Sequence, residues 1–565
     1  MKYQEIRDLI DKGKQFRTDK FKSRADKYVG WYNARYVDKQ GKVIVYRANV
    51  TYSTIRTIIA SLYAGDPDFS INIGPDTSDP SVATKIKQLS GIDIGPDDFD
   101  TLAIGLEEGL KLTLSKVRIK KIIKNALRNA LLMGLGVVKV GYKIDLKDKE
   151  TFKLRKKHKQ LLDACDSGNT LIKEYPFIVN IDPRSMLFPP DAMDFDQLEW
   201  QCQEKDVDAD YIKDIYNVEL DPLAVGNSTT NQMNENKITM YEFHSMSEPI
   251  PKIYILADGY SEIINEQVHP LFNPATGDCD NMFKYLWFND NPEALYPISD
   301  IEYVNDQILE CNIAIERRTQ FIHKMRAMYL LKGQWDENQI RKWESGEDLT
   351  FIENMNNDGS VDVLPMPTLG NEFYSHIKYV QSEILEILGM TDYSMGGATQ
   401  HRKATEAAFV EQGRKTRVEE RMDIIEDFVN SQVKTLLDVM KEYQCEPQLF
   451  GFRYNDQQIQ MRMGAELLGL TNMQVQVVKG STVGLDRPAQ LRQVQQLVSL
   501  GQTFAPVANI VEIYKEALRS LGYKNYARFI KQGGPNPVQA NQQGSVPVPG
   551  EMPNQIQQQN GGMPQ

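Results

Sequence analysis

The chain has 565 residues, of which 41% are hydrophobic and 25% charged. This length and balance exclude a small disulfide-stapled scaffold and a wholly disordered chain, and they leave room for two to four domains. The 65 basic and 77 acidic residues give a net charge of −12. That sign excludes a protein that grips nucleic acid tightly through phosphate contacts, but not one past which DNA slides.

Neither the cysteines nor the histidines form a pattern typical of a site. The five cysteines are odd in number and contain no CxxC pair, and none of the six histidines has a metal-like partner nearby in sequence. The chain also lacks the common phosphate-loop, hydrolase and zinc-protease motifs. The N-terminus has no signal-peptide core, and no apolar run is long enough to span a membrane. We therefore expect an intracellular chain that is not an enzyme, with no catalytic residue, cofactor, metal or membrane.

The first third of the chain predicts helices separated by loops. Residues 42–52 (KVIVYRANVTY) are typical of a short strand, and a helix is expected from Thr51 to Ala64. Residues 74–98 read as a loop, and one long helix is expected from Phe99 to Met133. The glycines of the following GLGVVKVGY do not stand between a strand and a helix, as those of a phosphate loop do. They predict a helix stop before a buried strand.

The middle of the chain predicts irregular β structure. The basic run KLRKKHK at 153–159 could touch nucleic acid, but a solvated face is the commoner origin of such runs. Residues 205–216 (KDVDADYIKDIY) resemble a calcium loop, yet Tyr211 and Asn217 occupy its glycine and glutamate positions. An aspartate-capped helix is the better interpretation. Residues 237–291 predict a strand-rich unit.

Two helices are then expected on either side of a compact insert, each with a continuous apolar stripe, which we call a seam. From Pro297 to Met325, and again from Phe373 to Ile387, apolar residues recur at spacings of three and four. Between them lie the helix-like DENQIRKWES and two strand-like runs, DLTFIEN and SVDVLPM, which the turn signal NNDG separates and which predict a hairpin.

The longest expected helix runs from Ala404 to about Tyr443, which corresponds to a length of roughly 60 Å and suggests a strut in an assembly. A loop with paired glycines, MTDYSMGGATQHRK, precedes it, and a β segment at 449–478 follows. Two or three amphipathic helices and a tail rich in Pro, Gln and Gly end the chain. The fold class expected from this order is α+β, mainly α-helical.

This order of parts resembles that of tailed-bacteriophage portal proteins, the head-to-tail connectors, of the short-tailed phage type. PISDIEYVNDQILECNIAIERRTQFIHKM resembles their first stem helix, EFYSHIKYVQSEILEILGM their second, and KATEAAFVEQGRKTRVEERMDIIEDFVNSQV their long wing helix. NALLMGLGVVKVGY paired with PFIVNIDPRSMLFPPDAMDFDQLEW is similar to their wing.

The resemblance implies the following domains: a mixed α/β wing at 1–296, a first stem helix at 297–329, a small α/β clip at 330–370, a second stem helix at 371–389, a tunnel loop at 391–403, the long helix and C-terminal part of the wing at 404–484, a helical crown at 485–533 and a flexible tail at 534–565.

The resemblance also implies a function. Portal proteins form a ring of twelve subunits at one capsid vertex, which is the channel for DNA packaging and ejection and the docking platform for terminase and head-to-tail adaptors. The implied partners are further copies of the chain, the terminase large subunit, adaptor proteins, the major capsid protein and double-stranded DNA that passes non-specifically. The implied location is the virion, with host cytoplasm during assembly. The alternatives are another ring-forming virion component without DNA passage, or a metal-dependent nucleic-acid hydrolase.

Three sets of site residues follow from the resemblance. The tunnel-loop set, expected to face DNA, is Asp392, Ser394, Gly396, Gly397, Thr399, Gln400, His401, Arg402 and Lys403. The stem set, expected between subunits, is Ile301, Val304, Ile308, Ile315, Ile377, Val380, Ile384 and Ile387. The clip set, expected to dock partners, is Arg326, Lys332, Arg341, Lys342 and Trp343.

Overall fold

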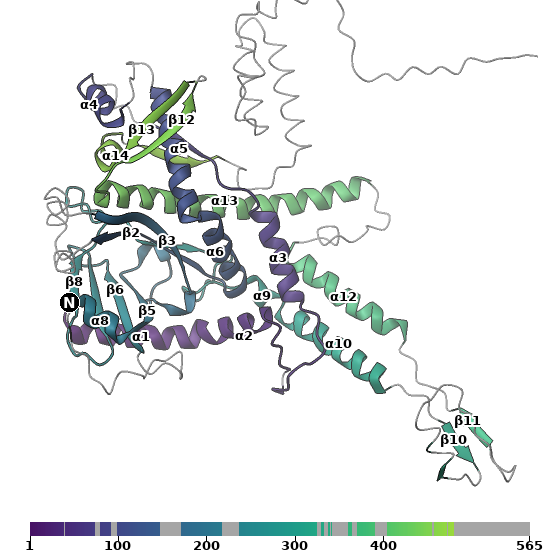
Figure 1. The fold of residues 1–565 in the computed structure, drawn as a ribbon. Coiled ribbons are helices and arrows are strands. Elements are labelled where there is room, and N and C mark those ends of the chain that lie inside the picture. Colours follow the sequence, from purple (N-terminus) through teal and green to yellow (C-terminus); the bar gives the residue numbers. More distant parts are fainter. Residues whose placement is uncertain are drawn as a thin grey trace, which may run out of the picture. The chain divides into compact units, whose positions relative to one another are not determined.

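The structure is a computed structural model. It describes residues 1–38, 40–73, 80–91, 99–146, 171–216, 218, 237–324, 329–332, 337–338, 341, 360–363, 370–389, 404–454, 457–471 and 473–478. The chain divides into two compact units, one of Met1–Phe452 with Ile459–Gly484 and one of Arg453–Gln458 with Leu485–Gln565. Nearly all the described residues belong to the first unit, whose elements are labelled in Figure 1.

The N-terminal segment forms helices, the first of which packs across one face of the five-stranded sheet described below. Helix α1 (Tyr3–Arg17) continues through a π-helical turn (Thr18–Lys22) into α2 (Ser23–Tyr32), as Figure 1 shows. Ile6 and Ile10 of α1 are fully buried in a core cluster with Trp200 and Phe243. The sequence pattern did not predict this helix, because each of its turns contributes only about one residue to the buried face.

The strand expected at 42–52 is wrong. Among the described residues of 36–49, Val37 and Val43 make an isolated β-bridge and no strand forms, and α3 (Val50–Leu62) begins where the strand should have continued. The apolar alternation is present, with Ile44 buried and Val43 exposed, but no partner strand extends beyond that bridge. A segment with a strand-like sequence forms a β-strand only when a neighbouring strand supplies its hydrogen-bond partners. The helix expected at 51–64 is confirmed by α3.

The single helix expected at 99–133 is also wrong. The structure has α5 (Phe99–Val117) and α6 (Ile119–Met133), because Arg118 takes the left-handed conformation with φ of +61° and breaks the helical path. The expected stop at Gly134 is confirmed: this residue has φ of +93°, and β2 (Gly136–Leu146) follows. A Cβ on Gly134 would stand 2.5 Å from the carbonyl oxygen of Pro297.

Two antiparallel sheets form the centre of this unit. The three-stranded sheet has the order β3-β2-β9, with β3 at Leu171–Ile181 and β9 at Phe283–Leu286. The five-stranded sheet has the order β4-β5-β6-β7-β8. Its strands are Met186–Leu187, Trp200–Asp208, Lys237–Ser245, Lys252–Ala257 and Asn265–Val268. The strand-rich unit expected at 237–291 is confirmed. So is the helix expected in KDVDADYIKDIY, as α8 (Ala209–Tyr216).

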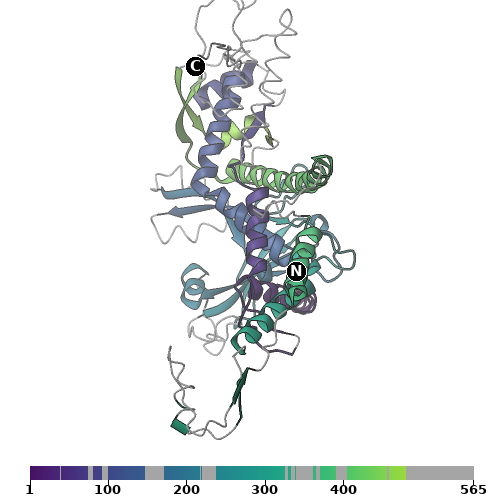
Figure 2. The ribbon, with the colours of Figure 1, turned by 90° about the vertical axis from the view of Figure 1, so that its right-hand side faces the viewer.

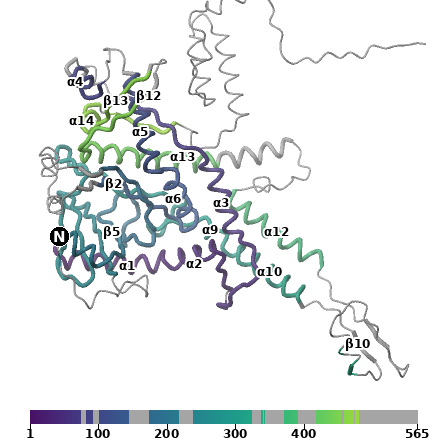
Figure 3. Tube along the Cα trace, in the orientation of Figure 1, coloured from purple at the N-terminus to yellow at the C-terminus, as the bar shows by residue number. Residues whose placement is uncertain are grey.

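The second half of the chain supplies long helices and short hairpins. The helices are α9 (Asp300–Tyr303), α10 (Asn305–Lys324), α12 (Asn371–Ile387), α13 (Ala404–Tyr443) and α14 (Ala465–Leu470). Strands β12 (Gln448–Tyr454) and β13 (Gln457–Met463) pair with each other, and β14 (Gln474–Val477) pairs with β1 (Phe69–Asn72). The loop expected at 74–98 is wrong in part, because α4 (Pro80–Ser90) lies within it. Short 3-10 helical turns occupy Pro183–Ser185 and Phe195–Gln197. Figures 2 and 3 trace the same path.

Of the hairpin expected in the insert, one strand is confirmed, but its pairing partner differs from the expected one. Strand β11 (Ser360–Val363) is present where SVDVLPM predicted it, but it pairs with β10 (Tyr329–Lys332), in register from Tyr329 opposite Val363 to Lys332 opposite Ser360. DLTFIEN, the expected partner, lies outside the described residues. The mixed α/β architecture with several small sheets agrees with the expected α+β class. Among the described helices, none combines the length and apolarity needed to cross a membrane.

Candidate functional site

The most distinctive feature of the second half is an antiparallel helix pair, α10 with α12. The two helices pack side by side (Figure 1). Near the middle of α10, Cys311 hydrogen-bonds Gln381 of α12, while Tyr303 just before α10 and Ile387 at the end of α12 line one cavity. The chain therefore leaves along α10 and returns along α12, and β10–β11 lies between the two helices in sequence.

The predicted stem residues form the seam of this pair. Six of the eight are at most 6% exposed in the single chain: Ile301, Val304, Ile308, Ile377, Val380 and Ile384. Ile315 is half-buried, and Ile387 is 41% exposed. The resemblance implies that all eight lie at the contact between subunits. Ile308, Ile377, Val380 and Ile384 lie on α10 and α12, which pack against each other within one chain. Ile301 and Val304 lie in and just after α9, which contacts α6. The role predicted for these residues between subunits stays a prediction.

A buried ion pair fixes the base of the helix pair to the long helix. Asp300, at the start of α9, is 2% exposed and accepts hydrogen bonds from Nη1 and Nη2 of Arg421 on α13, at 2.8 and 3.2 Å. Asn289 donates a third hydrogen bond to this carboxylate at 2.8 Å, and the Arg421 guanidinium lies over the Phe288 ring. A planar guanidinium that is paired, stacked and mostly covered holds a fixed orientation.

The same base is tied to the N-terminal helices. Ser299 caps α9 by accepting a hydrogen bond from the backbone N–H of Glu302. The Glu302 carboxylate pairs with Arg24 of α2 at 2.7 Å, and Lys27 donates to Asn305 at 2.7 Å. Contacts from α2 and α13 therefore fix the direction in which α10 leaves the body of this unit.

A cavity lies at this joint. Its lining comes from α3, α9, the end of α12 and α13, and it includes Asp300, Arg417 and Arg421. Gly389, directly after α12, has φ of +69°, and Arg417 approaches to 2.9 Å of where its Cβ would be. The tight turn at Gly389 thus packs against α13.

The clip residues are only partly described. Lys332 ends β10 and lies opposite Ser360, and Arg341 is highly exposed, with Glu337 4.0 Å away. Arg326, Lys342 and Trp343 lie outside the described residues. The tunnel-loop set lies entirely within 390–403, which the structure does not describe. The roles predicted for both sets stay predictions.

A buried polar cluster, which the sequence analysis missed, joins the two sheets. Lys139 of β2 donates to both carboxylate oxygens of Glu242 on β6, at 2.5 and 2.6 Å, and His244 Nε2 lies 2.9 Å from Glu242. Burial opposes the charge of Glu242, but Lys139 and His244 together hold its pKa well below the usual range. No sequence signal links these residues, because the strands that carry them are far apart in the chain.

His269 and Cys279 extend this cluster. The His269 ring lies edge-on to His244, and its Nδ1 lies 3.0 Å from Cys279 Sγ. Burial, with the neighbouring His244, lowers the pKa of His269 to about 3. Among the described residues, Nε2 of His269 and Nδ1 of His244 are buried and have no hydrogen-bond partner. Within the part of the chain that the structure describes, no group of three or more His, Cys, Asp or Glu side chains could hold a metal ion.

Part of the chain matches the model of a known protein family. Residues 323–563 match the family model of the phage SU10 portal protein. This range begins at the end of α10 and includes β10, β11, α12, the Arg421 end of the ion pair and the strands that follow α13. No curated protein matches the chain.

Proposed function

We propose that this chain, which belongs to a phage portal protein family, assembles into a ring of twelve copies at one capsid vertex, and that double-stranded DNA enters and leaves the head through the centre of the ring. The α10–α12 pair is the stem of each subunit, the β10–β11 region is its clip, and the body with its two sheets is its wing. The net charge of −12 suits a channel past which phosphates slide without being held.

The observation that carries this proposal is the fixed joint at Asp300 and Arg421. A ring that transmits motor force or internal pressure needs stem helices that keep their angle to the rest of the subunit. Residues at the start of the stem are bonded to α13 through Arg421, to α2 through Arg24 and Lys27, and to Asn289 after β9. A free helical hairpin without such ties would swing about its connections.

Apolar side chains of the stem that stay exposed in a single chain support a contact that is repeated between neighbouring subunits. Tyr379 and Ile387 of α12 are 66% and 41% exposed. Large apolar side chains at such exposure favour an interaction surface, and a head-to-tail contact repeated around a closed ring covers every copy of it.

The proposal extends to the partners of the ring. Terminase and the head-to-tail adaptors dock on the clip through Lys332 and Arg341, together with Arg326, Lys342 and Trp343. The major capsid protein meets the wing, and residues 391–403 touch passing DNA. The protein then resides in the virion, after assembly in the host cytoplasm.

Electron microscopy of the purified full-length protein tests the assembly. We expect rings of twelve subunits with an axial hole. A particle that stays monomeric at all concentrations, or a ring without a hole, contradicts the proposal.

DNA passage needs a separate test, since a virion ring without DNA passage would look the same. Deleting Ser394–Thr399 should leave rings intact but lower DNA packaging or retention in the head. Heads that fill and hold a full genome at normal yield with this deletion would show that the loop is a connector only.

A further inference from the structure

A short loop beside the stem has an internal framework of its own. In residues 35–47, the Asp38 carboxylate accepts hydrogen bonds from the backbone N–H groups of Gln40 and Lys42, at 2.9 and 2.8 Å. Ile44 N–H donates to the carbonyl of Tyr36, and Gly41, at φ of +82°, completes the turn. Asp38, the acidic residue of this loop, thus has its carboxylate bonded to the backbone of the loop; Lys39 lies outside the described residues.

This docking loop, as we call residues 35–47, is buried on one side and apolar on the other. Tyr36 and Ile44 are fully buried, and the Tyr36 hydroxyl bonds Asn49 and Thr51. Val43, Val45 and Tyr46 point outward, at 59%, 63% and 40% exposure. Three large apolar side chains on one small ordered loop favour a contact with another surface over contact with water.

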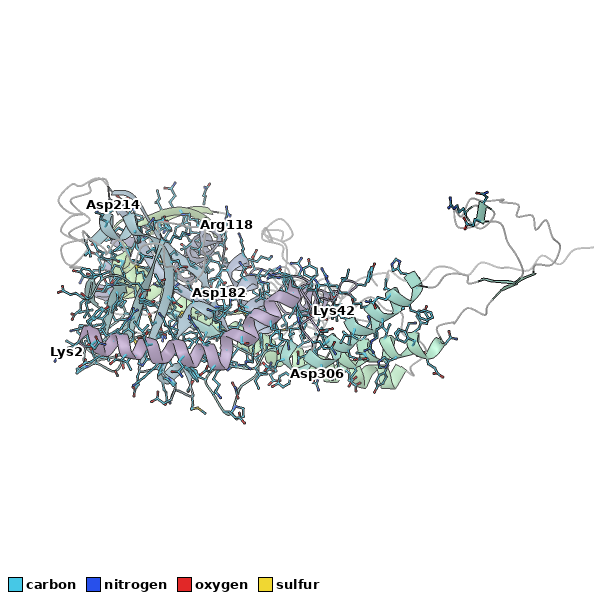
Figure 4. The ribbon with its side chains drawn as sticks, turned by 90° about the horizontal axis from the view of Figure 1, so that it is seen from below. Lys2, Lys42, Arg118, Asp182, Asp214 and Asp306 are labelled. Carbon is cyan, nitrogen blue, oxygen red and sulfur yellow. The ribbon has the colours of Figure 1, made fainter. Side chains whose placement is uncertain are left out.

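The docking loop lies against α10, on the side away from α12. The Tyr46 ring stacks on His323, near the end of α10, with 5.4 Å between ring centroids. In Figure 1, α10 lies between this loop and α12, and Figure 4 shows Lys42 of the loop beside the stem helices.

A second exposed stripe runs along α12. Glu372, Tyr379 and Glu386 are separated by seven residues each, so they line one face of the helix, and all three are exposed. The seam residues Ile377, Val380 and Ile384 occupy the opposite face. This acidic stripe, with its central tyrosine, therefore points away from α10 of its own chain.

The charges of the two surfaces are complementary. The docking loop carries exposed Arg35, Lys42 and Arg47 around its apolar side chains, and the acidic stripe carries a carboxylate about 10 Å to either side of Tyr379. Because the two surfaces lie on opposite sides of one stem, they cannot meet within a chain, but each can meet its complement on a neighbouring copy. A contact of this kind is head-to-tail, the type of contact from which a closed ring is built.

We infer that the docking loop of one subunit seats on the acidic stripe of the next, with Val45 and Tyr46 against Tyr379, and Arg35 and Lys42 near Glu372 and Glu386. The occupant of each surface is a second copy of this chain, and the inference rests on the proposed ring.

Charge reversal tests the contact in the full-length chain. In R35E/K42E, and separately in E372K/E386K, we expect the protein concentration at half-assembly to rise by about tenfold or more, as sedimentation velocity measures it. Combining all four substitutions restores opposite charges across each contact and should bring assembly back towards that of the wild type. The matched control is K12E/K20E, which makes the same charge change at exposed lysines of α1 and the π-helical turn and should assemble normally.

A covalent test gives an independent readout. Oxidation of K42C/E386C should produce a ladder of cross-linked multimers, whereas K42C or E386C alone should not. Normal assembly of both charge-reversed pairs, no rescue in the fourfold variant or no ladder from assembled rings would each overturn this contact and leave the ring intact. Failure of the wild-type chain to form rings would instead overturn the proposed function, and this inference with it.

Discussion

Arg421 of α13 donates hydrogen bonds from both of its terminal nitrogens to the carboxylate of Asp300 at the start of the stem, at 2.8 and 3.2 Å. The two residues are 121 positions apart in the sequence. Asp300 is almost completely covered, while Arg421 keeps about a fifth of its side chain in contact with solvent. Such a pair contributes little over a well-packed apolar replacement, but removing one partner leaves a buried charge without its counter-charge.

Replacing Arg421 with Met should therefore lower the free energy of unfolding by about 3 kcal/mol, at the low end for a broken buried pair because Arg421 reaches solvent. R421M/D300N should recover part of this loss, since the amide carries no charge. Urea unfolding below the concentration of ring assembly measures both. The matched control is R317M at an exposed arginine of α10, which should change stability by no more than about 0.5 kcal/mol. Additive effects of R421M and D300N would show that the two residues are not coupled.

The seam of the stem pair predicts a contrast between two isoleucines of α12. Ile384 is fully buried, so I384A should leave a cavity and cost about 3 kcal/mol. Ile387, three residues later, is 41% exposed, and I387A should cost under about 1 kcal/mol in the isolated chain. Thermal unfolding of the unassembled protein tests this order. Equal losses in the two variants would mean that the seam is not where the structure places it.

Periodicity alone predicted the elements that pack through one apolar stripe. The bounds of α12 and α13 agree with the spacing of their apolar residues, and the stop at Gly134 follows from the glycine. The contact between subunits that the stem seams predicted stays a prediction, because an apolar stripe shows that a face is buried, not what covers it. Neighbouring helix and neighbouring subunit leave the same pattern in the sequence.

Other features have no local signal at all. Nothing in the residues around Arg118 marks a left-handed conformation, since Arg is an ordinary helix former. Asp300 and Arg421 are two among 142 charged residues, so a single sequence cannot pair them. The cluster around Glu242 depends on strand register between two sheets, which is set by tertiary packing.

The two left-handed residues that flank α6 predict opposite responses to small substitutions. Arg118 is exposed at φ of +61°, so R118G removes backbone strain without losing packing and should stabilise the protein by about 1 kcal/mol. Gly134 is left-handed too, and G134A adds a Cβ 2.5 Å from the carbonyl oxygen of Pro297. The free energy of unfolding of this variant should be lower by about 2 kcal/mol or more. Melting temperatures measure both, and stabilisation by G134A would contradict the described backbone.

The buried histidine pair predicts how stability depends on pH. The pKa of His269 is lowered to about 3 because burial penalises the imidazolium and His244 lies beside it. In the unfolded chain the same ring titrates near its ordinary pKa of 6.5. Between these two values the unfolded state binds one more proton than the folded state, so acid favours unfolding.

The free energy of unfolding should therefore fall by up to about 1.4 kcal/mol for each pH unit below 6.5 on account of His269 alone. In H269N this share of the slope should vanish, while the amide oxygen can still accept the backbone N–H of Leu271, which donates to His269 Nδ1 at 3.3 Å. Urea titrations of both proteins from pH 7 to pH 4 test the difference. The control is H376N, because His376 is half-exposed on α12 and its replacement should leave the steep acid slope in place. If H269N loses stability on acidification as steeply as the wild type, His269 is not buried in its neutral form.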